Sequence, residues 1–274
     1  MRRWLNFPVA GQNCAATLDD AGGTHGLLLI SGGNEIRSGA HRSQSWLAGE
    51  VAARGHPVLR YDRRGIGDSE GENGGFLTSA ADIAAAAAAF RAACPKLQYI
   101  TAFGNCDAAA ALMLFHAATD INALLLANPW VVEDGADSGD TPALPPAAAI
   151  RARYWSKLRR PDEWLRLLRG GVDPGKLWRG LMAARGGSTA PQRADSLSAQ
   201  MAAAMQRSDI RATLLLARGD RTAQIFIEQW LSPLWQPLHA RIPAHYVESA
   251  SHGFADDMAR DWLLGQILSA LSPD

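Results

Sequence analysis

Three side chains in this sequence could together carry out nucleophilic chemistry on a carbonyl group, and they are Cys106, Asp220 and His252. A histidine beside a cysteine can take the thiol proton, and the thiolate then attacks an ester or thioester carbonyl. An aspartate behind the imidazole holds the useful tautomer and stabilises its positive form. Because the three residues lie far apart along the chain, this chemistry requires a fold that brings three loops together.

Each of the three residues follows an apolar segment that we expect to be a buried strand. Cys106 follows the segment 98–103, Asp220 follows 211–217, and His252 follows 245–248. In an open parallel sheet, ligands bind outside the carboxyl ends of the strands, where such residues meet. Taken alone, an aspartate after a strand is usually a turn or cap residue, and a histidine before a helix is usually a cap or a solvated residue. The prediction of a triad therefore depends on all three occurring in this order and context.

The sequence Gly-Asn-Cys-Asp-Ala at 104–108 joins the predicted strand to an alanine-rich helix. Strand, sharp turn and helix resemble the nucleophile elbow G-x-S-x-G of α/β-hydrolases, with cysteine in place of serine. Gly104 and Ala108 are small enough to let strand and helix approach closely. The turn would lift the Cys106 sulfur above the sheet edge and aim the Asp107 N–H toward an oxyanion. An inert, buried cysteine is the alternative interpretation.

The Asp107 side chain raises a question of its own. Its charge beside the sulfur opposes thiolate formation unless it points away or pairs with a basic residue. Otherwise it complements the dipole of the helix that it begins. On the other side, both His252 and the helix N-terminus favour the thiolate form of Cys106.

A second oxyanion donor is expected in the sequence Ser-Gly-Gly-Asn at 31–34, which follows the apolar strand 26–30. Either Gly33 or Asn34 would supply it, although a plain tight turn explains the glycines equally well. The loop that follows carries His41 and Arg42, which with Trp130 are candidate substrate-binding residues. A solvated loop histidine is the alternative for His41. Ser31 and Ser69 could serve as nucleophiles instead of cysteine, but neither lies in an elbow.

Alternating strands and helices predict an α/β fold with a mostly parallel sheet and helices on both faces. An antiparallel hairpin is expected at residues 1–20, and the core comprises residues 1–133 and 208–274. Residues 134–207 interrupt the alternation. Within them, residues 150–185 carry arginine, lysine and tryptophan at helical spacing, and residues 196–207 are predicted to form a further helix. We interpret them as a helical lid inserted over the strand ends. Their basic and aromatic side chains could bind a substrate, or could belong to helices with one face on the core and one in water.

A closer resemblance can now be stated. Residues 62–69 read Asp-Arg-Arg-Gly-Ile-Gly-Asp-Ser, similar to the D-x-R-G-x-G-x-S segment of α/β-hydrolases, where we expect the arginine and aspartates to tie loops together beneath the site. The chain resembles α/β-hydrolases over nearly its whole length. Within them it is similar to the exosortase A system-associated hydrolase 1 family, found in bacteria that make exported, sorted proteins and exopolysaccharide. The segments that carry this similarity are 32–34, 38–42, 59–62, 64–71, 106–109 and 128–131.

The resemblance implies a cytosolic hydrolase or acyl-handling enzyme and supplies no substrate. From the residues we predict a hydrolase that cleaves an ester or thioester through an acyl-thioenzyme, the substrate being small or bound to a carrier. A thioester intermediate also suits transfer to an acceptor, so an acyltransferase is a second hypothesis. A catalytically inactive hydrolase fold that binds a partner through the lid is a third.

Composition bounds these hypotheses. The 274 residues include 27 basic and 27 acidic side chains, so nothing indicates nucleic-acid binding. Three cysteines at 14, 94 and 106 fit no zinc site or disulfide framework, which favours a reducing, cytoplasmic setting. No apolar run reaches the roughly 18 residues of a membrane span, and no signal peptide is expected. We expect no cofactor or metal, and the oligomeric state is not predicted.

Overall fold

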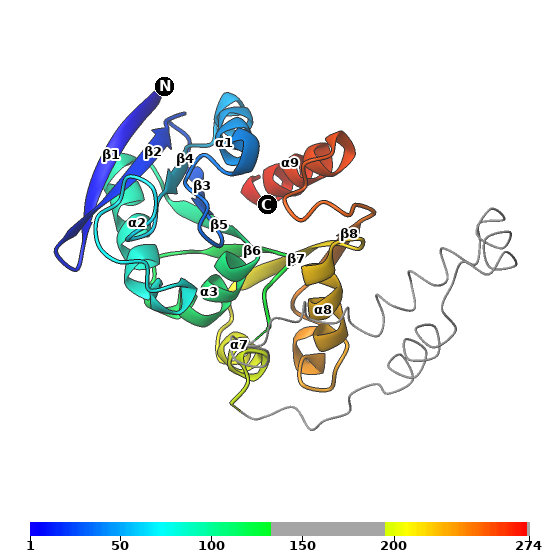
Figure 1. Cartoon of the computed structure of the whole chain (residues 1–274). Coiled ribbons are helices and arrows are strands. Elements are labelled where there is room, and N and C mark those ends of the chain that lie inside the picture. The colour runs from blue at the N-terminus through cyan, green and yellow to red at the C-terminus, as the bar shows by residue number, and fades with distance from the viewer. Residues whose placement is uncertain (133–194, 273–274) are drawn as a thin grey trace, which may run out of the picture. The chain divides into compact units, whose positions relative to one another are not determined.

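The computed structural model describes residues 1–132 and 195–272. They form one eight-stranded sheet with helices on both faces (Figure 1). The strand order is β1-β2-β4-β3-β5-β6-β7-β8. The strands are β1 Arg2–Val9, β2 Gln12–Asp19, β3 His25–Ile30, β4 Val58–Tyr61, β5 Tyr99–Asn105, β6 Ala123–Ala127, β7 Arg211–Ala217 and β8 Ala244–Val247.

The first two strands form the expected hairpin, and β2 also runs antiparallel to β4. All the later pairings, from β3–β4 across to β7–β8, are parallel. The carboxyl ends of β3, β5, β6, β7 and β8 therefore lie at one edge of the sheet, which we call the carboxyl edge. The opposite edge, where these strands begin, is the amino edge. The predicted mostly parallel sheet is confirmed.

The helices cover the two faces of the sheet. Two of them, α1 and α9, pack on one face, while α2, α3, α7 and α8 pack on the other (Figure 1). Their bounds are α1 Ser43–Ala53, α2 Ala80–Ala93, α3 Asp107–Phe115, α7 Leu197–Gln206, α8 Arg221–Trp230 and α9 Asp257–Leu271. Short 3-10 turns occur at Ala40–Arg42, Phe76–Thr78, His116–Ala118 and Gln236–Leu238.

The apolar strands explain this two-faced packing. In β3, Leu28 and Ile30 join the cluster under α2 and α3, whereas Leu27 and Leu29 join the cluster under α1 and α9. Successive side chains of a strand point to opposite faces, so a continuous apolar run is what a strand covered on both sides requires. Burial of these side chains fixes the register that aligns the strand ends.

The helix predicted at 196–207 forms as α7, but it belongs to the compact unit that contains the sheet. Its Met201 and Met205 are fully buried in the core cluster, and it packs against α3. The structure thus joins residues 197–207 to the core, although the sequence pattern assigned them to the insertion. Both methionines are apolar at helical spacing, a pattern that suits a lid helix and a core helix equally well. The rest of the predicted insertion, up to residue 194, lies outside the described residues.

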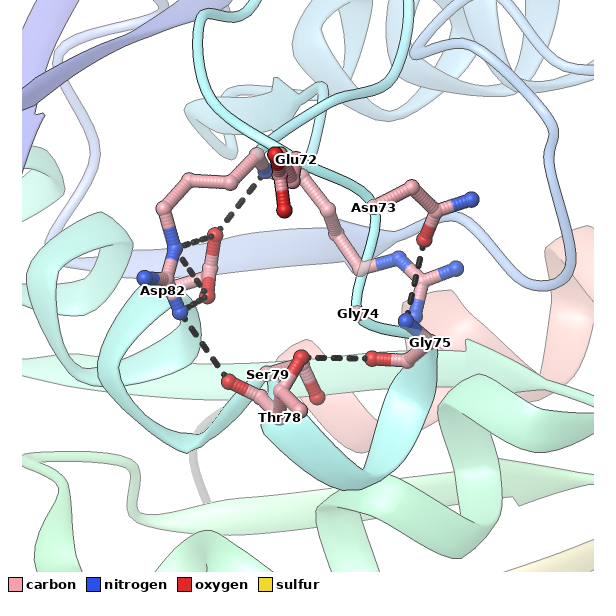
Figure 2. Close-up of a pocket in the computed structure, with 9 residues that line it drawn as sticks. Glu72, Asn73, Gly74, Gly75, Thr78, Ser79 and Asp82 are labelled. Atoms are coloured by element: carbon pink, nitrogen blue, oxygen red, sulfur yellow. Dashed lines mark hydrogen bonds and ion pairs between the residues drawn. The ribbon is translucent and has the colours of Figure 1, made fainter.

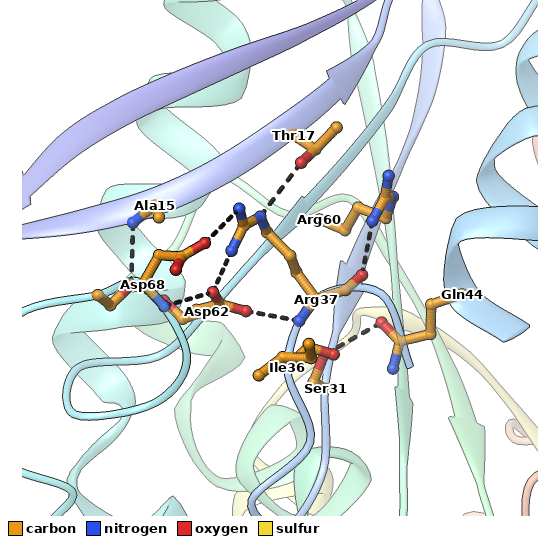
Figure 3. A network of polar contacts seen from close by, with 10 residues as sticks. Ala15, Thr17, Ser31, Ile36, Arg37, Gln44, Arg60, Asp62 and Asp68 are labelled. Carbon is orange, nitrogen blue, oxygen red and sulfur yellow. Dashed lines mark hydrogen bonds and ion pairs between the residues drawn. The ribbon is translucent and has the colours of Figure 1, made fainter. Parts of the chain in front are cut away.

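A buried charge network holds the loops after β3 and β4 together (Figure 3). At its centre the Arg37 guanidinium pairs with Asp62 and, at 2.8 Å, with Asp68. Asp62 also accepts the Arg37 N–H at 2.5 Å and the Asp68 N–H at 3.1 Å, and Arg60 donates to the Arg37 carbonyl. The aspartates of the 62–69 segment thus tie loops together, and their partner is Arg37, which lies outside that segment. Of the two arginines within the segment, Arg63 donates to the Gly33 carbonyl oxygen in the loop after β3, and Arg64 pairs with Asp82 on α2.

Candidate functional site

Cys106 lies on a sharp turn between β5 and α3. It has φ of 62° and ψ of −126°, a backbone conformation that non-glycine residues rarely adopt. Its N–H donates to the Ala127 carbonyl at 3.0 Å, and its carbonyl accepts the Trp130 N–H at 3.1 Å. These two hydrogen bonds to the segment at and after β6 hold the strained turn in place. The thiol is partly exposed.

Close packing around this turn requires glycine at two positions. A Cβ on Gly104 would lie 2.7 Å from the Ala108 carbonyl carbon, so strand and helix could not approach as they do. A Cβ on Gly32, in the loop after β3, would lie 2.6 Å from the Asn105 carbonyl oxygen. Both contacts are far shorter than van der Waals distance. The elbow is therefore built by its small neighbours, as its sequence indicates.

The structure brings the three predicted triad residues together at the carboxyl edge. His252 Nδ1 lies 3.0 Å from Asp220 Oδ2. The pKa of His252 is raised from its ordinary value of 6.5 to about 10, first by the hydrogen bond to Asp220 and then by one to Cys106. Partial burial of the ring acts in the opposite direction and does not cancel these effects. Both hydrogen bonds therefore favour the protonated form of His252.

Asp220 is held rigidly for its position behind the imidazole. Its side chain is only 8% exposed, and the same Oδ2 that meets His252 accepts the Ala223 N–H at 2.9 Å. It is thereby the N-cap of α8. The two readings of an aspartate after a strand, helix cap and histidine partner, are therefore both satisfied by one carboxylate.

The Asp107 side chain pairs with a main-chain N–H rather than with a basic residue. Its Oδ1 accepts the Gly33 N–H at 2.6 Å, so the carboxylate bridges from α3 to the loop after β3. The same loop forms a tight turn in which Glu35 N–H donates to the Gly32 carbonyl. The Asn34 side chain contacts another loop, because its Oδ1 accepts from Asn73 at 2.8 Å. Of the two expected main-chain donors, the Gly33 N–H thus meets the Asp107 carboxylate at the elbow.

A cavity of about 920 Å³ opens beside Cys106 and His252. Its size falls in the range typical of small-molecule sites, roughly 300 to 1,000 Å³. His41 and Arg42 line it, both in the left-handed backbone region with φ of 50° and 63°. Apolar walls come from α1, β5, α9 and the His252 loop, through Trp46, Leu47, Phe103, Phe254 and Leu263.

Trp130 is not among the residues that line this cavity. It is partly buried against the core cluster, and its main-chain N–H is its tie to Cys106. His41 and Arg42, by contrast, share the cavity with the sulfur. The three candidate substrate-binding residues therefore do not form one group in the structure.

A much smaller cavity of about 10 Å³ lies between the loop 72–75 and the start of α2 (Figure 2). Its Asp82 is already paired with Arg64, and Thr78 Oγ1 donates to the Gly75 carbonyl at 3.0 Å. That volume holds about one water molecule. It is too small to take an acyl substrate, so the cavity beside Cys106 is the candidate site.

The other possible nucleophiles have structural partners. The Ser31 hydroxyl is buried and donates to Gln44 and Ile36, and the Ser69 hydroxyl donates to the Asp62 carbonyl at 2.7 Å. Cys14 and Cys94 are buried, and burial raises the pKa of both thiols, that of Cys94 to about 11. Among the described residues, only Cys106 combines a nucleophilic side chain with a histidine and an open cavity.

Sequence reasoning missed two asparagines that contact the candidate triad. Asn105 is the last residue of β5 and Asn128 directly follows β6, and the side-chain amides of both donate to the His252 carbonyl oxygen at 3.1 Å. A polar residue at the end of a buried strand was the available signal, and both lie at the same edge as the triad.

Comparisons with known proteins agree with this architecture. The sequence model described as the alpha/beta hydrolase family matches residues 25–265. No curated protein matches the sequence significantly. An esterase of Pyrococcus furiosus superposes with a TM-score of 0.62 at 12% identity, over 99% of this chain and 94% of that one. The thioesterase domain from the curacin biosynthetic pathway gives a TM-score of 0.56 at 14% identity, over 98% and 99% of the two chains.

A third solved structure is an alpha/beta serine hydrolase of Xanthomonas campestris that is described as having no lid. It gives a TM-score of 0.58 at 13% identity, over 100% of this chain and 96% of that chain. At such low identities the solved structures show a shared fold and nothing finer. Among the helices of residues 1–132 and 195–272, none is both long and apolar enough to cross a membrane.

Proposed function

The chain belongs to the alpha/beta hydrolase family, and on that premise we propose that it cleaves ester or thioester bonds with Cys106 as the nucleophile. One observation carries the proposal: His252 is hydrogen-bonded to Asp220 at 3.0 Å and lines, together with Cys106, a cavity of substrate size. A cysteine that were only core filling would not need a strained turn, a histidine and an open cavity. The same geometry argues against an inactive fold that only binds a partner.

The proposed reaction has two steps. His252 holds the proton taken from Cys106, and the thiolate attacks the substrate carbonyl to form a C–S bond. The imidazolium then gives this proton to the leaving alcohol or thiol as its bond to the acyl carbon breaks. In the second step water, deprotonated by the neutral imidazole, attacks the acyl-thioenzyme and releases the acid. Asp220 keeps the imidazole oriented and stabilises its charge throughout.

We propose the N–H groups of Asp107 and Gly33 as the oxyanion donors, with Asn34 contributing through its loop. The geometry supports Gly33 and adds a condition. Its N–H is already taken by the Asp107 carboxylate at 2.6 Å, so the substrate carbonyl oxygen must replace that carboxylate oxygen. Asp107 would then occupy the oxyanion site when no substrate is bound. Both N–H groups would then face the negative charge that develops on the substrate oxygen in the transition state.

Substrate binding is proposed to involve His41 and Arg42, since both line the cavity with Cys106. The apolar walls suit the acyl chain, and the volume leaves room for part of a carrier or acceptor. For Trp130 the contact with the Cys106 carbonyl suggests support of the elbow rather than direct contact with substrate. A small acyl ester or thioester, free or bound to a carrier, is the proposed substrate class.

Acyl transfer is a second candidate function, and the size of the cavity favours it. A volume of about 920 Å³ can hold an acyl group together with an acceptor, and an acyl-thioenzyme is as well suited to attack by an acceptor as by water. The choice between hydrolysis and transfer then depends on whether an alcohol, amine or thiol outcompetes water.

We further propose membership of the exosortase A system-associated hydrolase 1 family, and with it an association with exopolysaccharide. Support comes from the position of the similar segments, because 32–34, 38–42 and 106–109 all contribute to the cavity or elbow. The three free cysteines suit a reducing compartment, so a cytoplasmic location is proposed.

A panel of p-nitrophenyl esters and acyl thioesters of increasing chain length tests the function. Wild type should turn over part of the panel, Cys106→Ala should lose that turnover, and Cys94→Ala should retain it. Added alcohol or amine acceptors separate transfer from hydrolysis by their products. Turnover that survives Cys106→Ala would overturn the mechanism.

A further inference from the structure

His252 stands on a loop and depends on few main-chain contacts for its position. The loop 248–256 runs between β8 and α9 and has no regular secondary structure. The His252 carbonyl oxygen accepts two hydrogen bonds, from Asn105 Nδ2 and from Asn128 Nδ2, each at 3.1 Å. Two lone pairs on one oxygen are thus used by two side-chain amides. These two side chains thus anchor the histidine backbone directly.

Asn128 is itself fixed by a full set of partners. It is completely buried directly after β6, with φ of 40°. Its Oδ1 accepts the Ala217 N–H of β7 at 2.9 Å, and its Nδ2 also reaches Asn105 Oδ1 at 3.3 Å. Because a buried amide loses hydrogen bonds when it rotates, the side chain has one stable orientation. Asn128 therefore connects the ends of β5, β6 and β7 to the His252 backbone.

We propose that Asn128, assisted by Asn105, is a positioning residue that sets the place of the His252 imidazole relative to Cys106 and Asp220. This inference rests on the proposed triad. Productive geometry at a catalytic site must be held within about 0.5 Å, and a loop residue without a main-chain anchor does not meet that limit. Asn128 is fully buried and does not line the cavity, whereas Asn105 lines it beside Cys106.

Other contacts fold the loop itself, which separates positioning from general stability. The Ser249 hydroxyl donates to Asp256, the Ser251 N–H donates to Ser249 Oγ at 3.0 Å, and the Ala255 N–H donates to Ser251 Oγ at 2.7 Å. These bonds do not involve the asparagines. Loss of the Asn128 amide should thus leave the loop folded and release the backbone of His252.

Asn122 provides a matched control at the amino edge of the sheet. It directly precedes β6, and its Oδ1 accepts the Ile100 N–H of β5 at 2.7 Å. It also contacts Arg91 at 3.2 Å. The residue type and the bridge between β5 and β6 are thus the same as for Asn128, but no triad residue is nearby. Asn122→Ala should cost stability without affecting the chemistry of Cys106.

The experiment measures the rate of Cys106 alkylation by iodoacetamide between pH 5 and 10 in full-length protein, with thermal unfolding in parallel. Asn128→Ala should move the midpoint of the rate profile upward by roughly one pH unit, because a displaced imidazole no longer holds the thiol proton. Asn105→Ala removes one of the two donors from a less buried position and should give a smaller upward shift. Asn122→Ala should leave the midpoint unchanged while lowering Tm.

The outcomes are distinguishable. If His252→Ala moves the midpoint and both Asn128→Ala and Asn105→Ala leave it unchanged, the asparagines are only structural and the positioning role is overturned. If His252→Ala itself leaves the midpoint unchanged, the triad is wrong and the positioning role fails with it. Should Asn128→Ala fail to fold, the Asn105→Ala profile decides, with an unchanged midpoint counting against the proposal.

Discussion

The two edges of the sheet carry similar residues in opposite circumstances. At the amino edge, Cys94 is buried, with its pKa raised to about 11 by desolvation, and Asn122 joins two strands. At the carboxyl edge, Cys106 is partly exposed beside His252, whose pKa is raised, and Asn128 joins three strand ends to that histidine. Each edge thus has a cysteine and an asparagine. We propose that the pair at the amino edge contributes only to stability, whereas the pair at the carboxyl edge takes part in the chemistry.

This difference shows that residue type does not decide function in this fold. What differs is strand direction, since parallel strands send the loops of β5, β7 and β8 to the same edge. Only there can a nucleophile, an acid and a histidine from distant parts of the chain meet.

The largest effect is expected from the histidines. His252→Ala should lower kcat/KM on the best substrate of the panel by roughly 10⁴-fold, as loss of a triad member does in related chemistry. His25, at the start of β3, stacks on Tyr99 at the amino edge, and His25→Ala should change kcat/KM by less than about twofold. Steady-state kinetics on purified variants decides this. Equal losses of kcat/KM in His252→Ala and His25→Ala would contradict the proposed difference between the two edges of the sheet.

Asp220→Asn should cost roughly 10³-fold in kcat/KM, because the imidazole loses its charged partner. Asparagine can still cap α8, so the fold should survive. The pKa of His252, followed by NMR, should fall from about 10 toward 6.5.

The same variant gives a pH dependence of stability. A histidine whose pKa is raised on folding stabilises the native state fully below pH 6.5, and that contribution disappears as pH rises through about 10. The urea midpoint of wild type should therefore exceed that of Asp220→Asn most at pH 6, with the gap narrowing by pH 10. A difference in urea midpoint that stays constant or widens as pH rises would contradict the pairing of His252 with Asp220.

Alkylation sharpens the comparison of the cysteines. At pH 7 iodoacetamide should modify Cys106 at least about 100-fold faster than Cys94 or Cys14, because both of the latter are buried thiols with raised pKa values. Peptide mass spectrometry after timed quenching measures each rate. Comparable rates at the three sites would count against a special environment for Cys106.

The smallest effect is expected at Asp107. Asp107→Ala frees the Gly33 N–H and removes a negative charge beside the sulfur, so kcat/KM should rise about threefold to tenfold. Asp107→Asn keeps a hydrogen-bond acceptor but removes the charge, so its kcat/KM should rise less than that of Asp107→Ala. A fall in the alanine variant with retention in the asparagine variant would instead show that the bond holds the loop after β3.

The sequence predicted the parts of this site that depend on local chemistry. The elbow was predictable because small residues, Gly104 and Ala108, lie two positions before and two positions after Cys106. The core was predictable because its strands are continuous apolar runs. The order of Cys106, Asp220 and His252 indicated which loops meet.

Other features were beyond sequence reasoning because they depend on distances across the fold. Arg37 is buried against Asp62 and Asp68 only once two loops meet. Residue spacing does not reveal that the Asp107 carboxylate accepts the Gly33 N–H. Nor does it reveal that Asn105 and Asn128 donate to one carbonyl oxygen. α7 was assigned to the insertion because helical periodicity does not say which surface a helix covers.

The most direct test is intact-protein mass spectrometry of wild type mixed with a slowly released acyl thioester. A mass increase equal to the acyl group, located on Cys106 by peptide mapping and removed by hydroxylamine, is predicted, together with its absence in Cys106→Ala. Two results would contradict the proposed chemistry of the carboxyl edge. One is turnover without an adduct on Cys106, and the other is an adduct on a different residue together with full turnover in Cys106→Ala.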